Sequence, residues 1–324
     1  MIYPLLFKPI FKERVWGGRQ LEKLYRKELP ADKVIGESWE ISDRPGDVSV
    51  IANGPLAGKD LRWLIDHHAD EVLGAAHAPD DRFPLLIKIL DAQDDLSLQV
   101  HPPAAIAGKL GGEPKTEMWY ITHATPKAAL YAGLKHGVSR TEFEEKLKAG
   151  TVAECFHRLP VKETDALFLP SGRVHAIGAG NVIFEIQQNS DTTYRVFDWN
   201  RVGLDGKPRD LHIAEAMASI DFNDFEPPLI DGRVAQGPTY STRALVSDVL
   251  FKVYEINLRA YDYCLPKMPK PQIIGMVEGR AAITSGEHPP VELRAGQFCL
   301  IPACCRTAKV STEKGCTFLL VDAG

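Results

Sequence analysis

The sequence predicts a mainly β protein in which strands pack as sandwiches or barrels and a few helices lie at the margins. Most of the chain consists of short strand-like segments separated by Gly, Pro and Asp. Helical periodicity is confined to a few short stretches, and no apolar run approaches the roughly 20 residues of a membrane helix. At 324 residues, 44% of them hydrophobic and 25% charged, the chain has room for one large globular domain or two of ordinary size.

The predicted strands are enriched in β-branched and aromatic residues, which suit a pleated, half-buried surface. They are ESWEIS (37–42), VSVIA (48–52), PLLIKIL (84–90), ALFLP (166–170), VIFEIQ (182–187), FKVYEINL (251–258) and TFLLV (317–321). Because these strands outnumber the helical segments, we expect a β-sandwich or barrel with helices as insertions.

Four segments have helical character. The first places one set of side chains on a single helical face, at Leu61, Leu64, Ile65, His68 and Val72. Two more have the spacing of a capping box, at Thr141 with Glu144 and at Thr151 with Glu154. The fourth is DLHIAEAMASI, residues 210–220.

A change in composition divides the chain into two parts. Residues 222–240, FNDFEPPLIDGRVAQGPTY, are rich in Pro, Gly and Asp, as linkers often are. The segment that follows is again strand-like. We therefore predict a larger first domain over residues 1–235, with helical insertions, and a smaller β-domain over residues 236–324.

Two segments, one in each predicted domain, are similar to each other. Residues 165–176 are DALFLPSGRVHA and residues 297–308 are QFCLIPACCRTA, and aligning their prolines places Thr307 opposite His175. This pattern indicates a weak internal repeat, although unrelated strand–Pro–turn segments would give similar strings. A threonine hydroxyl is a poor zinc ligand, so we expect the second domain to bind no metal. We expect it to pack against the first domain and to wall one side of the site.

Charge and cysteine content favour a cytoplasmic protein. The formal net charge of −5 gives no reason to expect nucleic acid or an anionic membrane as a partner. Charged residues interrupt the apolar N-terminus before an export signal could form, and the six cysteines include no CxxC pair. We therefore expect reduced thiols and a cytoplasmic location. The sequence leaves both a monomer and a dimer open.

Polar side chains alternate with apolar ones in two strand-like segments, SLQVH (97–101) and KTEMW (115–119). Alternate residues of a strand share a face, so Gln99 and His101 lie on one face, as do Lys115 and Glu117. Histidine and glutamate bind zinc and other divalent first-row metals, and a glutamine oxygen is a rarer ligand. Strand pairing would place QVH beside KTE, and a third strand would bring in His175. The predicted metal ligands are Gln99, His101, Glu117 and His175. The alternative is that these histidines are ordinary buried or surface residues.

These motifs also resemble those of a known family. The segment P-x-G-x-x-H, at Pro170, Gly172 and His175, resembles the second metal motif of the cupin superfamily. QVH with Glu117 resembles the first cupin motif, with glutamine in place of its usual first histidine. The longer runs resemble the short bacterial form of the type I mannose-6-phosphate isomerases over about residues 1–220. These runs are FKPIFKERVWGG, IGESWEIS, FPLLIKILDAQDDLSLQVHP, KTEMWYI, LPSGRVHAIGAG and EIQQNSDTTYRVFDWNR.

The resemblance implies two cupin-like jelly-roll domains and one zinc ion per chain, held in the first domain. It also implies interconversion of mannose 6-phosphate and fructose 6-phosphate. Moving a carbonyl between C1 and C2 requires removal of a proton next to the carbonyl, which gives an enediol with charge on oxygen. A divalent cation near those oxygens stabilises that charge, and zinc brings no redox chemistry.

Three residues compete for the acid–base role. Lys115 lies two residues before Glu117 on the same predicted face, where burial and a nearby cation would lower its pKa and make it a usable base. Arg195 matches the position that the family assigns as catalytic, and because arginine stays protonated, stabilising the enediolate suits it better. Glu185 is a carboxylate suited to proton or hydroxyl contacts. The alternative for all three is an internal ion-pair cluster.

Substrate binding requires a cation or directed donors for phosphate. Lys88 interrupts an apolar strand, where a bound phosphate would offset the cost of burying its charge, and otherwise its ammonium would reach out to solvent. Ser97 shares a face with Gln99, roughly 7 Å along the strand. Trp16 stacks on the sugar or packs in the core, and Asp191 is predicted to orient Arg195 or a ligand.

Two other functions remain open. Cupins include iron and manganese oxygenases, but these usually carry H-x-H where this chain has Q-x-H. A non-catalytic cupin that binds sugar phosphates would be expected to have lost its acid–base and ligand residues together, whereas this chain has all of them. The sequence therefore favours the isomerase, with a small sugar phosphate as its partner.

Overall fold

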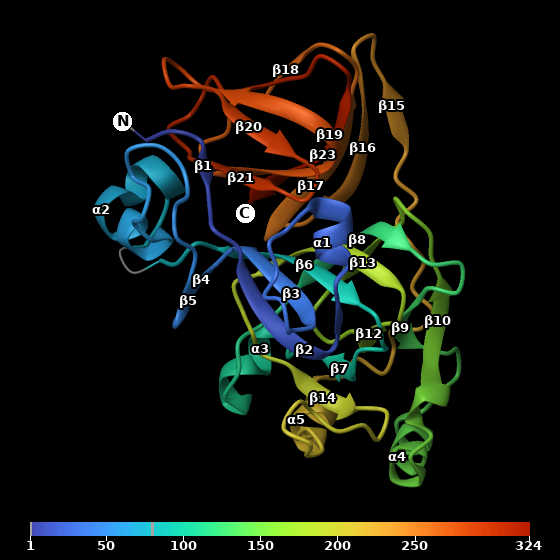
Figure 1. The fold of residues 1–324 in the computed structure, drawn as a ribbon. Helices are drawn as coiled ribbons and strands as arrows, with labels where there is room; N and C mark the ends of the chain where they lie inside the picture. The colour runs from blue at the N-terminus through green and yellow to red at the C-terminus, as the bar shows by residue number, and fades with distance from the viewer. Residues whose placement is uncertain (1, 79–80) are drawn as a thin grey trace.

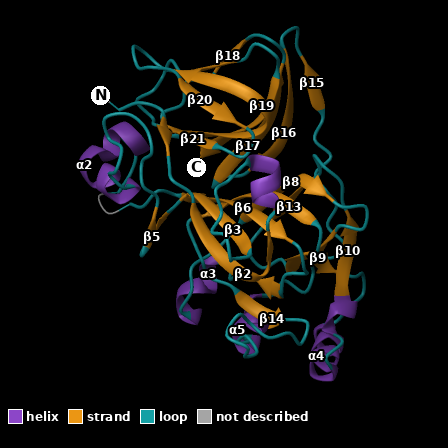
Figure 2. Cartoon of the chain, in the orientation of Figure 1, coloured by secondary structure: helices purple, strands orange, loops and turns teal. Residues whose placement is uncertain are grey.

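The computed structural model describes residues 2–78 and 81–324, and it confirms the mainly β architecture (Figures 1 and 2). Two sheets form the N-terminal part of the molecule, and a large curved sheet forms the C-terminal part. Short helices connect these sheets or cover them. The helices are α1 (Gln20–Tyr25), α2 (Leu61–Leu73), α3 (Ala104–Ala107), α4 (Arg140–Ala149) and α5 (Ile213–Ser219), with 3-10 turns η1 (Gly108–Leu110) and η2 (Val152–Cys155).

The first sheet has six antiparallel strands in the order β11-β8-β13-β6-β3-β2. In chain order they are β2 (Ile10–Gly18), β3 (Ile35–Ile41), β6 (Leu85–Ala92), β8 (Glu117–Ala124), β11 (Ala166–Leu169) and β13 (Asn181–Gln188). The second sheet has five, in the order β10-β9-β12-β7-β14. They are β7 (Leu98–Val100), β9 (Ala129–Leu134), β10 (Phe156–Pro160), β12 (His175–Ile177) and β14 (Tyr194–Phe197).

Both faces of the six-stranded sheet are buried, which explains the nearly continuous apolar run LLIKILDA in β6. Ile87 and Ile89 point to one face and join a core cluster that includes Phe298 and Val321 of the C-terminal part. Leu90, on the other face, belongs to the cluster between the two N-terminal sheets. Glu37, Lys88, Glu117 and Glu185 alternate in the same way and lie on this inner face.

The outer face of the five-stranded sheet packs against α4 and α5, which lie at the end of the molecule remote from the C-terminal part (Figure 1). Phe143 of α4 and Met217 of α5 belong to the same core cluster as Val100 and Val196 of the sheet. The two N-terminal sheets are therefore fixed by packing on their outer faces, and their inner faces enclose the polar residues.

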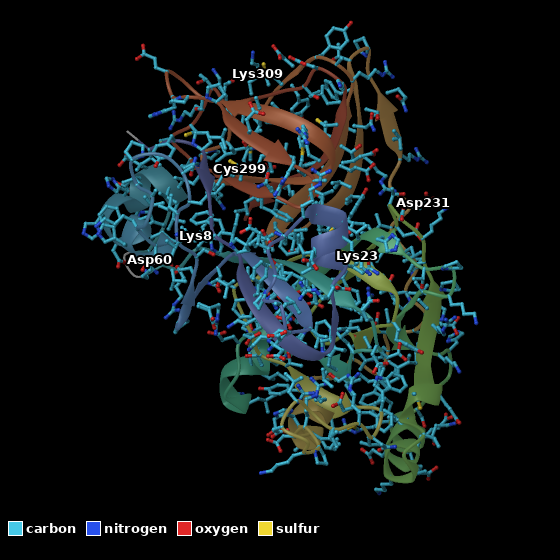
Figure 3. The ribbon with its side chains drawn as sticks, in the orientation of Figure 1. Lys8, Lys23, Asp60, Asp231, Cys299 and Lys309 are labelled. Carbon is cyan, nitrogen blue, oxygen red and sulfur yellow. The ribbon has the colours of Figure 1, made fainter. Side chains whose placement is uncertain are left out.

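The C-terminal part is a second β-unit, and Cys299 lies inside it (Figure 3). Its strands are β15 (Val234–Gln236), β16 (Tyr240–Ser247), β17 (Phe251–Leu258), β18 (Asp262–Cys264), β19 (Gln272–Thr284), β20 (Val291–Arg294), β21 (Phe298–Ile301), β22 (Lys309–Ser311) and β23 (Cys316–Ala323). The long β19 pairs with β21 and β23 through its first half and with β20 and β22 through its second. The N-terminal strand β1 (Leu5–Leu6) adds to this sheet beside β21.

The division at residues 235 and 236 remains our proposal for the domain boundary. Asp231 lies on the linker between the two parts (Figure 3), and β15 is the first strand after it to join the C-terminal sheet. Because β1 also joins that sheet, the N-terminal segment crosses the proposed boundary. Both segments of the suggested repeat begin with a strand and a turn, β11 and β21, but the second strand begins inside the first segment, at His175 in β12, and just after the second, at Lys309 in β22.

One predicted helix is present as expected, and several other predicted elements differ from those observed. The helix predicted from Leu61 is present as α2, capped by the Asp60 carboxylate, which accepts from Trp63 N. The cap of α4 is Ser139 rather than Thr141, and η2 is a single 3-10 turn. The segment 48–52 is not a continuous strand: it contributes the end of β5 (Asp47–Val48), which pairs with β4 (Asp43–Arg44), and isolated bridges. Within the described residues, no helix is long and apolar enough to cross a membrane.

Candidate metal centre and active site

Three predicted ligands converge between the two N-terminal sheets. The ligand atoms of His101, Glu117 and His175 all lie within 4.8 Å of one another, and the two imidazole rings are 4.7 Å apart between centroids. Glu117 Oε1 is 3.3 Å from His175 Nε2, and Glu117 Oε2 is 3.5 Å from His101 Nε2. All three side chains are buried. The spacing is short enough for one ion to bind all three.

The predicted strand pairing is wrong in one respect. Gln99 on β7 is the partner of His175 on β12, as expected, but Glu117 begins β8 in the opposite sheet. The two motifs therefore face each other across the sandwich rather than lying on neighbouring strands. The turn before His175 needs its glycine, because Gly172 has a φ of +95°. The Gly172 N–H also donates to His101 O, which links the turn to the other histidine.

The hydrogen bonds leave these ligand atoms free. The 2.9 Å contact from His175 Nδ1 to the Arg173 carbonyl requires the proton on Nδ1, because a carbonyl only accepts, so Nε2 offers a lone pair. Neither nitrogen of His101 and neither oxygen of Glu117 has a hydrogen-bond partner among the described residues, although all are buried and Glu117 Oε2 is ion-paired with Lys115 Nζ at 3.1 Å. Buried polar atoms without partners are rare, and a bound cation would satisfy them.

The protonation states also suit a cation. Burial lowers the pKa of His101 to about 3, and Lys115 contributes in the same direction. Burial likewise lowers the pKa of His175. Burial opposes ionisation of Glu117, but Lys115 and the two histidines hold its pKa well below the usual range. Two neutral imidazoles and one carboxylate are the ligand forms that metals require.

Gln99 is the fourth predicted ligand and lies at the edge of the group. Its Nε2 is 3.3 Å from His175 Nε2. A 180° rotation of the amide would place its oxygen there instead, because nitrogen and oxygen exchange positions. The residues present therefore fit a four-ligand set with two nitrogens and two oxygens.

A cavity of about 540 Å³ opens beside this group. All of the predicted catalytic and substrate-binding residues line it, together with one predicted ligand: Trp16, Lys88, Ser97, Gln99, Lys115, Glu185, Asp191 and Arg195. Among the described residues, none after Arg209 lines the cavity. The expectation that the C-terminal part walls the site is therefore wrong: that part packs on the opposite face of the six-stranded sheet.

Most cations that line the cavity are paired with a carboxylate. Lys88 Nζ is 3.3 Å from Glu185 and lies over the Trp39 ring, 5.1 Å from its centroid. Lys115 Nζ is 3.1 Å from Glu117. Arg14 pairs with Glu37 at 2.8 Å, and Arg209 pairs with Asp198. Arg195 is different: it donates from Nη1 to the Asp210 carbonyl at 2.7 Å, and its buried Nε has no partner among the described residues.

Comparison with known proteins agrees with this geometry. Residues 5–112 match the family model described as phosphomannose isomerase type I, catalytic domain. The mannose-6-phosphate isomerase ManA of Bacillus subtilis is 37% identical over 309 residues, 92% of this chain and 93% of the relative. The chain therefore belongs to the type I mannose-6-phosphate isomerase family.

Solved structures of the family have the same fold. The mannose 6-phosphate isomerase of Bacillus subtilis matches with a TM-score of 0.89 at 32% identity, over 99% of each chain. A mannose 6-phosphate isomerase solved with zinc and yttrium bound matches with a TM-score of 0.75, over 99% of this chain and all of the other. At 17% identity, that second likeness concerns the fold alone.

The carboxylates around Lys115 oppose the expected lowering of its pKa. Burial lowers it, but Glu117, followed by Glu185 and Asp191, more than offsets burial, and the net pKa is raised. The sequence placed Glu117 beside this lysine but did not show that Glu185 and Asp191 also lie near it. Protonated Lys115 suits charge stabilisation or proton donation better than the role of a base.

The structure brings the remaining predicted residues to the cavity in different settings. Ser97 is buried directly before β7, and Trp16 is 3% exposed and packs in the inner core cluster. Asp191 lies at the exposed rim. It makes no hydrogen bond to Arg195 within the described chain, where Asp210 occupies that role through its carbonyl. The predicted orienting role of Asp191 is therefore wrong for Arg195.

Sequence analysis missed a second group of lining residues, which includes Glu13, Arg14, Glu37 and Arg209. Glu37 could have been identified from the sequence. In the strand ESWEIS it lies two residues before Trp39 and shares its face, as Lys88 shares a face with Leu90, so a charge on a buried face was visible there. Arg14 and Arg209 gave no such signal, because they belong to a bulged strand and to a loop.

The ionised Glu37 side chain should make the unfolding free energy of the protein depend on pH in acid. Burial would raise its pKa, but Lys88 and Arg14, with hydrogen bonds from Arg14 and Trp39, lower it from 4.5 to about 2. A depressed carboxylate pKa stabilises the fold above pH 4.5, and this contribution is lost as the pH falls toward 2. We expect Glu37→Gln to cost on the order of 3 kcal/mol of unfolding free energy at pH 6 and much less at pH 2. Denaturant unfolding of both proteins checks this. A cost that does not change with pH would contradict it.

Proposed function

We propose that this protein is a zinc-dependent mannose-6-phosphate isomerase that interconverts mannose 6-phosphate and fructose 6-phosphate through an enediol. The observation that carries the proposal is the buried, closely spaced group of His101, Glu117 and His175, beside a cavity that holds the predicted catalytic residues. Family membership supplies the reaction. The zinc in a family neighbour and the donor types present here support zinc as the ion.

Zinc, held by Gln99, His101, Glu117 and His175, would act as a Lewis acid that stabilises charge on the substrate oxygens. The remaining chemistry belongs to side chains. Glu185 suits the base role, because it lines the cavity and burial raises its pKa. Its Oε1 accepts from Trp119 Nε1 at 2.9 Å, which fixes the carboxylate plane, and its Oε2 forms the ion pair with Lys88 Nζ at 3.3 Å.

We assign charge stabilisation to Arg195 and Lys115. Arg195 is a half-buried cation with no carboxylate partner among the described residues, so its guanidinium is available to a developing enediolate. Lys115 stays protonated beside Glu117 and would stabilise charge or return a proton to the substrate. Lys88 and Ser97, both buried in the cavity wall, would bind the phosphate, and the buried Trp16 and the exposed Asp191 would contact the sugar.

The alternative of a non-catalytic sugar-phosphate-binding cupin has no observation in its favour, because every predicted catalytic residue lines the cavity. We further propose a cytoplasmic location, since all six cysteines are free. The direct test is a coupled assay in which fructose 6-phosphate formed from mannose 6-phosphate is measured with the purified protein. A zinc-loaded protein that forms none would contradict the proposed function.

Lys88→Met tests the phosphate site. The change removes the charge but keeps most of the side-chain length, and because it also takes a cation from buried Glu37 and Glu185, thermal unfolding of the variant must first show that it is folded. We expect KM for mannose 6-phosphate to rise about tenfold or more, because a charge-assisted contact to the bound phosphate is lost. The value of kcat should change less. An unchanged KM in steady-state kinetics would show that the phosphate binds elsewhere.

A further inference from the structure

The loop after β14, residues 198–210, forms one wall of the active-site cavity. It folds back on itself as a short hairpin in which Val202 and Pro208 form a β-bridge and Gly203 N donates to Lys207 O. Leu204, at the tip, lines the cavity although it is 57% exposed. The position of this loop therefore affects the shape of the site.

A single buried carboxylate holds the loop together. Asp198 is 6% exposed and accepts from two arginines. Arg209 donates from Nε to Oδ2 at 2.7 Å and from Nη2 to Oδ1. Arg201 donates from Nε and Nη2 to Oδ1 at 3.1 and 2.9 Å. The carboxylate thus joins the two ends of the hairpin through four charge-assisted hydrogen bonds, which are directional and strong.

The far end of the loop is also the support of Arg195. Arg209 is followed directly by Asp210, whose carbonyl accepts from Arg195 Nη1 at 2.7 Å. Two residues later, His212 N donates to Arg195 O, and Arg195 N donates to His212 Nδ1. A change in the position of Arg209 would therefore move the carbonyl that orients the guanidinium.

The backbone beside Asp198 is strained. Trp199 and Asn200 have φ values of +55° and +54°, in the left-handed region that costs a non-glycine residue on the order of 1 kcal/mol. The indole of Trp199 donates to the Leu96 carbonyl at 2.7 Å, one residue before Ser97. Strain of this kind persists only where surrounding contacts enforce it, and it is concentrated at functional sites.

We propose that Asp198 is a positioning residue: by holding Arg209, it fixes the Asp210 carbonyl that aims the Arg195 guanidinium into the cavity. The inference rests on the proposed isomerase function and adds a residue that does not touch the substrate. Asp198→Asn keeps the shape of the side chain and removes the charge that binds both arginines. The expected result is a loss of turnover through misplacement of Arg195.

A double-mutant cycle tests this role, with kcat and KM for mannose 6-phosphate measured for the wild type, Asp198→Asn, Arg195→Ala and the double variant. Asp198→Asn should lower kcat roughly tenfold in the wild type, with little rise in KM, and less than about twofold when Arg195 is already absent. Equal losses in both backgrounds, or an unchanged kcat, would overturn the proposal.

Controls separate this role from stability and from the proposed function. Glu255→Gln removes a comparably buried ion pair with Arg243, 2.7 Å long, in the C-terminal sheet, and should leave kcat unchanged. If Asp198→Asn does not fold, Arg209→Gln breaks the same contact from its more exposed side and must show the same coupling to Arg195. A wild type without isomerase activity would refute the proposed function. An active wild type with no coupling would refute only the positioning role.

Discussion

His101→Ala is expected to abolish zinc binding and to lower isomerase activity roughly 1,000-fold or more. His101 is 1% exposed, and neither ring nitrogen has a hydrogen-bond partner among the described residues. Removing the ring therefore costs few contacts within the protein other than packing, and its main effect falls on the metal. Loss of Lewis-acid stabilisation of the enediolate costs several kcal/mol in the transition state.

The measurement is metal content per chain, by atomic spectroscopy, together with the coupled assay. His123→Ala is a suitable control, because His123 is a partly exposed histidine that pairs with Glu163 outside the site. It should retain full zinc and full activity. The metal assignment would fail if His101→Ala kept one zinc per chain and normal turnover.

Arg195→Ala is expected to lower kcat about 100-fold to 1,000-fold while KM changes little. Among the cations that line the cavity, Arg14, Lys88, Lys115 and Arg209 each have a carboxylate partner, whereas Arg195 is held by a backbone carbonyl. Its charge is therefore not neutralised before substrate binds. A donor aimed at developing charge contributes mainly in the transition state, so its loss appears in kcat.

Two further variants sharpen this prediction. Arg195→Lys keeps the charge but not the planar group that reaches the Asp210 carbonyl, and it should recover only part of the activity. Arg158→Ala removes another guanidinium that donates to a backbone carbonyl, that of Lys127, and should have no effect on turnover. A tenfold or larger rise in KM with normal kcat would place Arg195 in substrate binding instead.

The sequence predicted the fold class and the residues around the cavity because strand alternation is a local property. Gln99 with His101, and Lys115 with Glu117, lie on the expected sides of their segments, since alternate residues of a strand share a face. Lys88 was recognisable because a charge inside an apolar strand needs a partner. The local pattern thus identified the group of residues before their arrangement was known.

The arrangement itself depends on tertiary contacts that no local pattern encodes. Alternation says that Glu117 faces inward, but not that β8 belongs to the sheet opposite β7. The raised pKa of Lys115 depends first on Glu117, two residues away, but also on Glu185 and Asp191, which are 70 or more residues away in sequence. The ion pairs of Asp198 were invisible for the same reason, because loop residues carry no periodicity that fixes their partners.

The measurement that tests the central claim most directly is a zinc titration of the metal-free enzyme, with bound zinc and isomerase rate followed together. We expect the rate of fructose 6-phosphate formation to rise linearly with added zinc and to reach its limit at one equivalent per chain. The claim rests on one ligand group, His101, Glu117 and His175, in the N-terminal part. It would be contradicted if activity were full without metal. A rate that required two equivalents, with one lost on mutation of a cysteine after residue 260, would place a second metal site in the C-terminal part.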